Sequence, residues 1–259
     1  MNWSLLILPS SLVLFGILEY KFPFFTYKLS WPNRVATNFS LAILNSLLKS
    51  LLLVSLLQWV YQHNTGLFNS IPSPWVVGIL SILVLDSYRY GWHVLMHKLP
   101  IGWRFHRVHH TDRAMNISTA YRFHFVESFL SYFPMFFVIW LFGLNPIYVL
   151  IYESLFVIDE VFQHSNWALP LKVDRILSYL IITPNCHRVH HSQVVKETDS
   201  NYGSLLTIWD RLFGTFRYSR APKTIKIGLR EEPRHLNILD SLALPFVFPR
   251  PNTKTNLSP

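Results

Sequence analysis

Long apolar stretches separated by short polar segments dominate the first two thirds of the chain. They cover residues 4–20, 39–61, 75–90 and 129–162. A membrane-spanning helix needs about 20 mainly apolar residues, so the first three stretches are each suited to one span. The fourth is interrupted by Gly-Leu-Asn-Pro at residues 143–146, which predicts a turn between two helices. The pattern therefore predicts an all-α fold of polytopic membrane helices, with about three spans and a helical hairpin.

The composition favours a membrane protein over a soluble one. Of the 259 residues, 51% are hydrophobic and 14% are charged, whereas a soluble domain carries about 25% charged residues. The apolar stretches leave no soluble half of domain size, so we expect one domain over residues 1–248 and a disordered polar tail at residues 249–259. The first stretch has neither a basic segment before it nor a cleavage site after it, and we expect it to remain as a helix.

The distribution of basic residues predicts the orientation in the membrane. The net charge is +9, but the basic residues flank apolar segments and form no nucleic-acid-binding motif, so we expect no nucleic acid partner. Basic residues follow the first and third stretches, while residues 62–74 contain no Lys or Arg. The positive-inside rule then places the N-terminus outside and the chain after the third stretch and after the hairpin in the cytoplasm. Residues 203–216 are amphipathic and either lie on the membrane or cover the cytoplasmic region.

Histidines are concentrated in one part of the chain, in a spacing that predicts metal binding. Ten of the twelve histidines are His93, His97, His106, His109, His110, His124, His164, His187, His190 and His191. They include HxxxH at residues 93–97 and HxxHH at residues 106–110 and 187–191, and residues three or four apart share one face of a helix. All ten fall on the predicted cytoplasmic side, which indicates one histidine-rich helical cap. The other two, His63 and His235, are expected at the surface.

The number of histidines predicts two metal ions. Imidazole binds Fe, Zn, Cu and Ni, and the motifs contain no cysteine or carboxylate. A closed zinc site uses about four ligands and a catalytic one about three, so ten histidines leave room for a second ion and for water or substrate. A metal transporter, with its ligands near the bilayer midplane, and a histidine-rich metal-binding scaffold remain as alternatives without redox catalysis. The single cysteine, Cys186, is expected to be a small core residue.

Four polar residues near the histidines are candidates for orienting them through hydrogen bonds. Asp86 lies two helical turns before the HxxxH motif, where it either accepts a hydrogen bond from a ligand or is an interfacial acid beside Arg89. Glu127, Asn166 and Asn185 each lie two or three residues from a histidine. These three residues are equally suited to capping helices or to bonding loops.

The order of the motifs resembles the fatty acid hydroxylase and sterol desaturase superfamily. The resemblance covers residues 34–216 and rests on WHVLMH, HRVHH, a histidine before the hairpin, QHSN after it, a second HRVHH, and NYGSLLTIWDRLFGTF. It implies that all ten histidines bind metal. The chain departs from the family at Phe125, where relatives often have proline after the histidine that precedes the hairpin. This departure bears on the roles of His124 and Glu127.

The resemblance also implies the reaction. Members are membrane-bound oxidoreductases with a non-haem dimetal centre, usually iron, that use O2 and external electrons to hydroxylate or desaturate lipids; zinc also fits the ligands in purified protein. We expect a lipid or sterol-like substrate to enter from the bilayer. No cytochrome b5 domain precedes the first helix, so we expect a separate electron donor of the cytochrome b5 or ferredoxin type. The unfused architecture favours a bacterial cytoplasmic membrane over the endoplasmic reticulum.

Overall fold

The computed structural model describes residues 4–27 and 31–247, and every regular element within them is a helix. This confirms the predicted all-α class. The expected disordered tail, residues 249–259, lies outside the described residues. The helices are α1 Ser4–Lys21, α2 Trp31–Leu52, α3 Val54–Gln62, α4 Pro74–Lys98, α5 Pro100–His110, η1 Ile117–Tyr121, α6 Phe125–Leu130, α7 Tyr132–Phe142, α8 Pro146–His164, α9 Leu171–Leu177, α10 Pro184–His190, α11 Val195–Thr198, α12 Ile208–Leu212, η2 Pro222–Thr224, α13 Ile238–Ala243 and η3 Leu244–Phe246.

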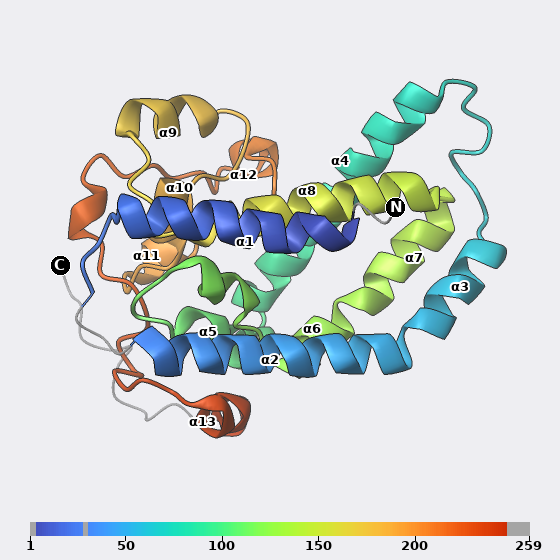
Figure 1. The fold of residues 1–259 in the computed structure, drawn as a ribbon. Coiled ribbons are helices and arrows are strands. Elements are labelled where there is room, and N and C mark those ends of the chain that lie inside the picture. The colour runs from blue at the N-terminus through green and yellow to red at the C-terminus, as the bar shows by residue number, and fades with distance from the viewer. Residues whose placement is uncertain (1–3, 28–30, 248–259) are drawn as a thin grey trace.

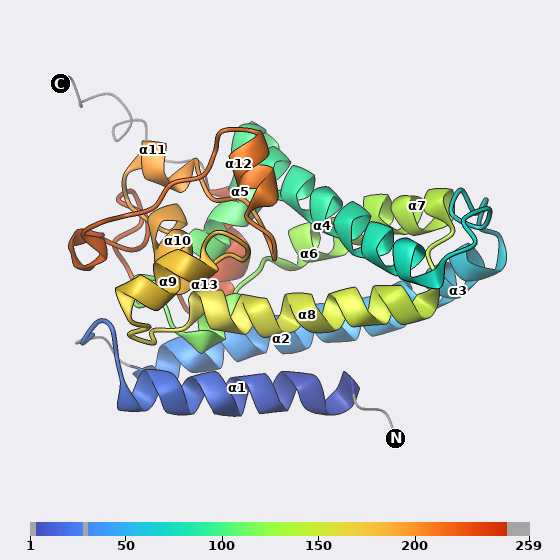
Figure 2. The same cartoon turned by 90° about the horizontal axis from the view of Figure 1, so that it is seen from above.

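The long helices pass back and forth along the long axis of the molecule (Figure 1). α1 packs against α8, α8 packs against α4, and α3 packs against α7 at the far end. Because successive passes reverse direction, α4 and α8 both finish at the end where α5 and α10 lie, as both views show (Figures 1 and 2). The segments that carry the histidine motifs therefore meet at one end of the bundle.

The long helices are apolar on their outer faces as well as in the core. Leu85 of α4 and Ile139 of α7 are fully buried in the core between the helices. On the outside, Ile79 of α4 is 61% exposed, Phe137 of α7 56% and Ile151 of α8 42%. A surface helix of a soluble protein carries polar side chains on this face. The arrangement therefore matches helices surrounded by lipid.

Two helical segments of the described chain are long and apolar enough to cross a membrane, judged by length and composition. They are Pro32–Leu52 and Phe125–Phe142. The other predicted stretches also form helices near their expected places, since α1 covers residues 4–20 and α4 covers residues 75–90. The stretch at residues 39–61 is divided between α2 and α3, with the break at Leu53.

The turn of the predicted hairpin is built by its Gly-Leu-Asn-Pro sequence. Gly143 ends α7 with φ of 66°, in the left-handed region that glycine adopts without strain. A Cβ on Gly143 would lie 2.3 Å from the Cα of Gly66, so only glycine fits this approach. The Asn145 side chain then accepts a hydrogen bond from the Ile147 N–H at 2.9 Å and caps α8, whose first residue is Pro146.

Candidate metal centre

The histidine motifs lie on helix ends that face one another. HxxxH occupies the last two turns of α4, and the two HxxHH motifs end α5 and α10. Leu99, in extended conformation, separates α4 from α5, and Pro100 starts the new helix. The chain reverses there, so the rings of His97 and His106 lie 4.8 Å apart between centroids.

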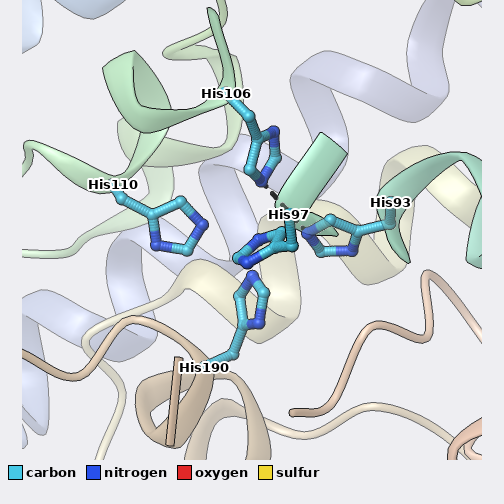
Figure 3. A group of neighbouring side chains, drawn as sticks. All are labelled: His93, His97, His106, His110 and His190. Carbon is cyan, nitrogen blue, oxygen red and sulfur yellow. Dashed lines mark hydrogen bonds between the residues drawn. The ribbon is translucent and has the colours of Figure 1, made fainter. Parts of the chain in front are cut away.

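The structure brings nine of the ten predicted histidines into two groups. The first group is His93, His97, His106, His110 and His190 (Figure 3). The second group is His109, His164, His187 and His191. Within each group the ligand nitrogens all lie within 4.8 Å of one another. The groups adjoin, since the rings of His110 and His191 stack with centroids 4.5 Å apart.

Each HxxHH motif is shared between the two groups. In the α5 motif, His106 and His110 belong to the first group and His109 to the second. In the α10 motif the assignment is reversed, so that only His190 belongs to the first group. Residues four apart project in nearly the same direction from a helix, whereas the neighbouring residue points about 100° away. Two such helices side by side therefore present histidine nitrogens to two separate positions.

The spacing of the ring nitrogens fits coordination of a common ion. In the first group, Nε2 of His93 lies 3.1 Å from Nε2 of His106 (Figure 3). In the second, Nε2 of His187 lies 2.8 Å from that of His164 and 3.1 Å from that of His191. Nitrogens bound at about 2.1 Å to one metal lie roughly 3.0–3.4 Å apart in octahedral or tetrahedral geometry. The side chains are thus arranged as ligands around two positions.

Unpaired ring nitrogens support the same interpretation. Among the described residues, Nε2 of His97, of His110 and of His190 is buried without a hydrogen-bond partner. Leaving a buried polar atom unpaired costs about 1–3 kcal/mol, and native proteins keep few of them. All three belong to the first group, where one metal ion would satisfy them together. The donor set therefore fits a bound metal.

The electrostatics favour neutral imidazoles. Burial lowers the pKa of His109, His110 and His187 well below the ordinary value, and the neighbouring imidazoles lower it further. A histidine binds metal through its neutral ring, so no proton has to be removed near neutral pH. The nine rings form a nitrogen-rich site of the kind that iron, zinc and copper accept.

Glu127 orients a histidine of the first group. Its carboxylate accepts a hydrogen bond from Nδ1 of His106 at 2.7 Å, and both side chains are buried. A carboxylate on Nδ1 fixes the proton there and leaves Nε2 free to bind metal. The sequence pointed to Glu127 as a partner of His124, three residues before it, whereas the structure places it against a histidine of α5. In the second group the Glu160 carbonyl accepts from Nδ1 of His164 at 2.8 Å.

The segment of residues 199–210 covers the first group. The carbonyl of Ser200 accepts from Nδ1 of His190 at 2.7 Å, and that of Tyr202 from Nδ1 of His93 at 2.9 Å. Asp210 holds this segment in place by accepting from the Tyr202 N–H at 2.8 Å. Residues 203–216 follow directly after these two carbonyls, and whether they lie on the membrane or cover the cytoplasmic region stays a prediction. Sequence reasoning missed both carbonyls, because a backbone group carries no residue signal.

His124 lies outside both groups. It is the N-cap of α6, where Nδ1 accepts a hydrogen bond from the Val126 N–H at 3.2 Å. Nε2 lies 3.3 Å from the Leu242 carbonyl, to which it donates. Both ring nitrogens are therefore engaged away from the groups, although the sequence placed this residue among the ligands.

Asp86 contacts the covering segment and not a histidine. Its carboxylate accepts hydrogen bonds from the Leu205 and Leu206 N–H groups and from Nε1 of Trp209 at 2.8–3.2 Å. Seven residues of α-helix advance about 10.5 Å, which is beyond the reach of an aspartate toward His93. Asp86 instead joins α4 to the chain that follows the second HxxHH motif.

The remaining sequence candidates also bond the backbone. Asn166 holds the chain after α1 by accepting from the Phe25 N–H at 3.0 Å and donating to its carbonyl at 2.9 Å. Asn185 donates to the Ser219 carbonyl at 3.0 Å. Both side chains form hydrogen bonds to loop backbone, which is the second of the two roles that the sequence allowed. Cys186 is buried, while His63 and His235 are exposed.

The sequence of this chain is also similar to those of known proteins. A model of the fatty acid hydroxylase family matches residues 78–215, which include all nine grouped histidines. Alkylglycerol monooxygenase of Danio rerio is 33% identical over 180 residues, covering 67% of this chain and 37% of the relative. The Xenopus tropicalis alkylglycerol monooxygenase is 32% identical over 172 residues, covering 63% and 36%. Ornithine lipid hydroxylase OlsE of Rhizobium tropici is 31% identical over 180 residues, covering 68% and 53%. The chain thus spans between 36% and 53% of the length of these relatives, and no solved structure matches it.

Proposed function

Because this chain belongs to the fatty acid hydroxylase family, we propose that it is a membrane-embedded dimetal oxygenase that hydroxylates a lipid. The resemblance inferred from the histidine motifs is thereby confirmed. The observation that carries the proposal is the pair of adjoining groups of histidine nitrogens. The named relatives are a monooxygenase and a lipid hydroxylase, which favours hydroxylation over the desaturation that the motifs also allowed.

We propose iron as the metal, because the ligands are nitrogen atoms and the reaction is a redox reaction, which zinc does not support. A bound iron pair would supply the activation of O2 and the removal of hydrogen from an unactivated C–H bond. Overall, one oxygen atom of O2 enters the alcohol and the other leaves as water, at the expense of two electrons and two protons. The chain's own groups hold the centre: Glu127 fixes His106, and the carbonyls of residues 200 and 202 fix two further rings.

The position of the centre suggests how substrate and electrons reach it. With the apolar outer faces of α4, α7 and α8 in lipid, the two histidine groups lie at the end of the bundle, which we propose faces the cytoplasm. A lipid chain would approach from the bilayer without crossing water. Electrons would come from a separate cytochrome b5-type or ferredoxin-type donor in the aqueous phase. Residence in a bacterial cytoplasmic membrane stays a prediction.

The proposal is tested by metal analysis and isotope labelling. The protein is purified in mild detergent, its iron is measured per chain, and lipid extracts are incubated with the protein, a reductant and 18O2. We expect about two metal ions per chain and one labelled oxygen atom in a lipid alcohol. His187→Ala, in the group of four histidines, should lose both properties, whereas His63→Ala, which changes an exposed histidine far from the groups, should keep them. Metal-free wild type, or an alcohol whose oxygen comes from water, would refute the proposal.

A further inference from the structure

A cavity of about 390 Å³ lies beside the histidine groups and contains none of their members. Five separate parts of the chain line it: the segment after α1, the start of α2, the turn after α5, the turn after α10 and the loop at residues 225–235. Thr111 in this lining follows His110 directly, and Gln193 lies two residues after His191. The cavity is therefore placed directly behind both HxxHH motifs.

The wall of the cavity is tied to the second HxxHH motif by backbone pairing. The Gln193 N–H donates to the Lys226 carbonyl at 2.8 Å, and the Gly228 N–H donates to the His191 carbonyl at 3.0 Å. Gly228 has φ of 101°, and a Cβ there would lie 2.7 Å from Cγ of Arg113. Glycine thus lets the Arg113 side chain lie against the loop. The result is a wall that is hydrogen-bonded directly to His191, a candidate metal ligand.

Five of the twelve residues that line the cavity are basic. They are Arg34, Arg113, Lys226, Arg234 and His235. Arg34 is paired with Asp112 at 2.7 Å, and Arg234 with Glu232 at 2.8 Å. Within the described residues, the other arginine and the lysine form no ion pair, and no acidic residue lines the cavity. The cavity therefore holds two positive charges that no carboxylate of the described chain neutralises.

Two further observations indicate an anionic occupant. The hydroxyl of Tyr27, which lines the cavity, is buried and has no hydrogen-bond partner within the described residues. A phenol hydroxyl in such a place needs an acceptor. The pKa of His235 is lowered by partial burial and then by the positive charges of Arg122 and Arg34. Burial lowers this pKa whatever the local charge; the smaller contribution of the two arginines is the part that reflects positive charge, and Asp112 opposes it.

We propose that this cavity binds an anionic oxygen group, a phosphate or a carboxylate, through Arg113, Lys226 and the Tyr27 hydroxyl. Charge-assisted hydrogen bonds from arginine and lysine are the strong contacts in such sites. The Arg113 side chain is positioned for this role because its Nη1 already donates to the Pro233 carbonyl at 2.8 Å. The group can belong to a lipid headgroup or to a soluble molecule. In either case it would contact the turns that follow both HxxHH motifs.

Calorimetry on the full chain in detergent tests the site with three probes: dioctanoyl phosphatidic acid, the uncharged dioctanoylglycerol, and inorganic phosphate. We expect phosphatidic acid to bind, more weakly as ionic strength rises, and dioctanoylglycerol to bind at least about tenfold more weakly. Inorganic phosphate that binds as tightly as phosphatidic acid would indicate a soluble ligand. A clear preference for phosphatidic acid would indicate a headgroup. Equal binding of the two lipids, or no binding of either phosphate probe, would overturn the proposal.

Substitutions in the cavity lining test whether phosphatidic acid binds at this site. The double variant Arg113→Gln and Lys226→Gln should weaken phosphatidic acid at least about tenfold, and its metal content should equal that of wild type if it is folded. Lys226→Gln alone changes an exposed side chain and should weaken binding even if the double variant does not fold. Lys223→Gln, an exposed lysine outside the lining, is the matched control and should bind like wild type. Unchanged affinity in the Lys226 variant and in a folded double variant would contradict the assignment.

Discussion

Nε2 of His109 and Nε2 of His164 lie 3.1 Å apart, although 55 positions separate the two residues in the chain. The contact joins the first HxxHH motif to the histidine that ends the hairpin. It requires α5 and α8 to finish at the same end of the bundle, with their last turns turned toward each other. The second histidine group can form only because the ends of α5 and α8 lie next to each other.

The two groups should differ in their tolerance of ligand loss. The second group has four histidines and the first has five. Removing one of four leaves fewer ligands than a stable closed site uses. We therefore expect His187→Ala to lower metal affinity by more than about 100-fold, and His97→Ala to lower it less. Metal titration of both variants checks this, and an equal loss would show that ligand number does not decide retention.

Glu127 should tune the first group through His106. Loss of an outer hydrogen-bond partner of a ligand typically costs about 10–100-fold in metal affinity or activity. We expect Glu127→Ala to show this loss and Glu127→Gln, which keeps an acceptor oxygen, to recover part of it. Metal affinity and product formation are measured together. A Glu127→Ala variant with wild-type affinity would mean that the 2.7 Å contact does not influence the ion.

His124 should matter for helix stability and not for metal content. Its Nδ1 caps α6, and loss of a cap costs about 0.5–2 kcal/mol. We expect His124→Leu to lower the midpoint of thermal unfolding, and His124→Asn, which can also cap, to lower it less. Both variants should keep the full metal complement. Loss of one metal ion in the His124→Asn variant would show that His124 is a metal ligand.

Asp86 should hold the covering segment. Removing its carboxylate leaves the buried N–H groups of residues 205 and 206 unpaired, at about 1–3 kcal/mol each. We expect Asp86→Ala to increase hydrogen exchange at residues 203–210 while both histidine groups still bind metal. Asp86→Asn should exchange at an intermediate rate. Protection equal to wild type in the alanine variant would show that the segment is held elsewhere.

Acid should destabilise the metal-free protein. The folded pKa of His109, His110 and His187 lies below the ordinary value of 6.5, so below that pH the unfolded chain binds more protons than the folded one. Stability contributed by the neutral rings is present above this value and decreases as the pH falls. Thermal unfolding with a chelator should therefore show a falling midpoint from pH 7 to pH 5. A midpoint that rises on acidification would contradict buried neutral imidazoles.

The sequence by itself determined the long helices, the hairpin turn and nine of the ten histidines it singled out. Each of these depends on neighbours close in the chain: apolar runs of helical length, a glycine and an asparagine at residues 143 and 145, and histidines spaced at three or four residues. Local spacing decides which side chains share a helix face.

Only the tertiary structure decided how the histidines are divided and what holds them. Whether His190 joins the group of His93, and whether Glu127 contacts His106 or His124, depends on how helices far apart in the chain pack against each other. The covering carbonyls of residues 200 and 202 are set by a backbone path that Asp86 and Asp210 stabilise. Distances of a few ångströms between such segments arise from packing the whole bundle, and no spacing along one helix encodes them.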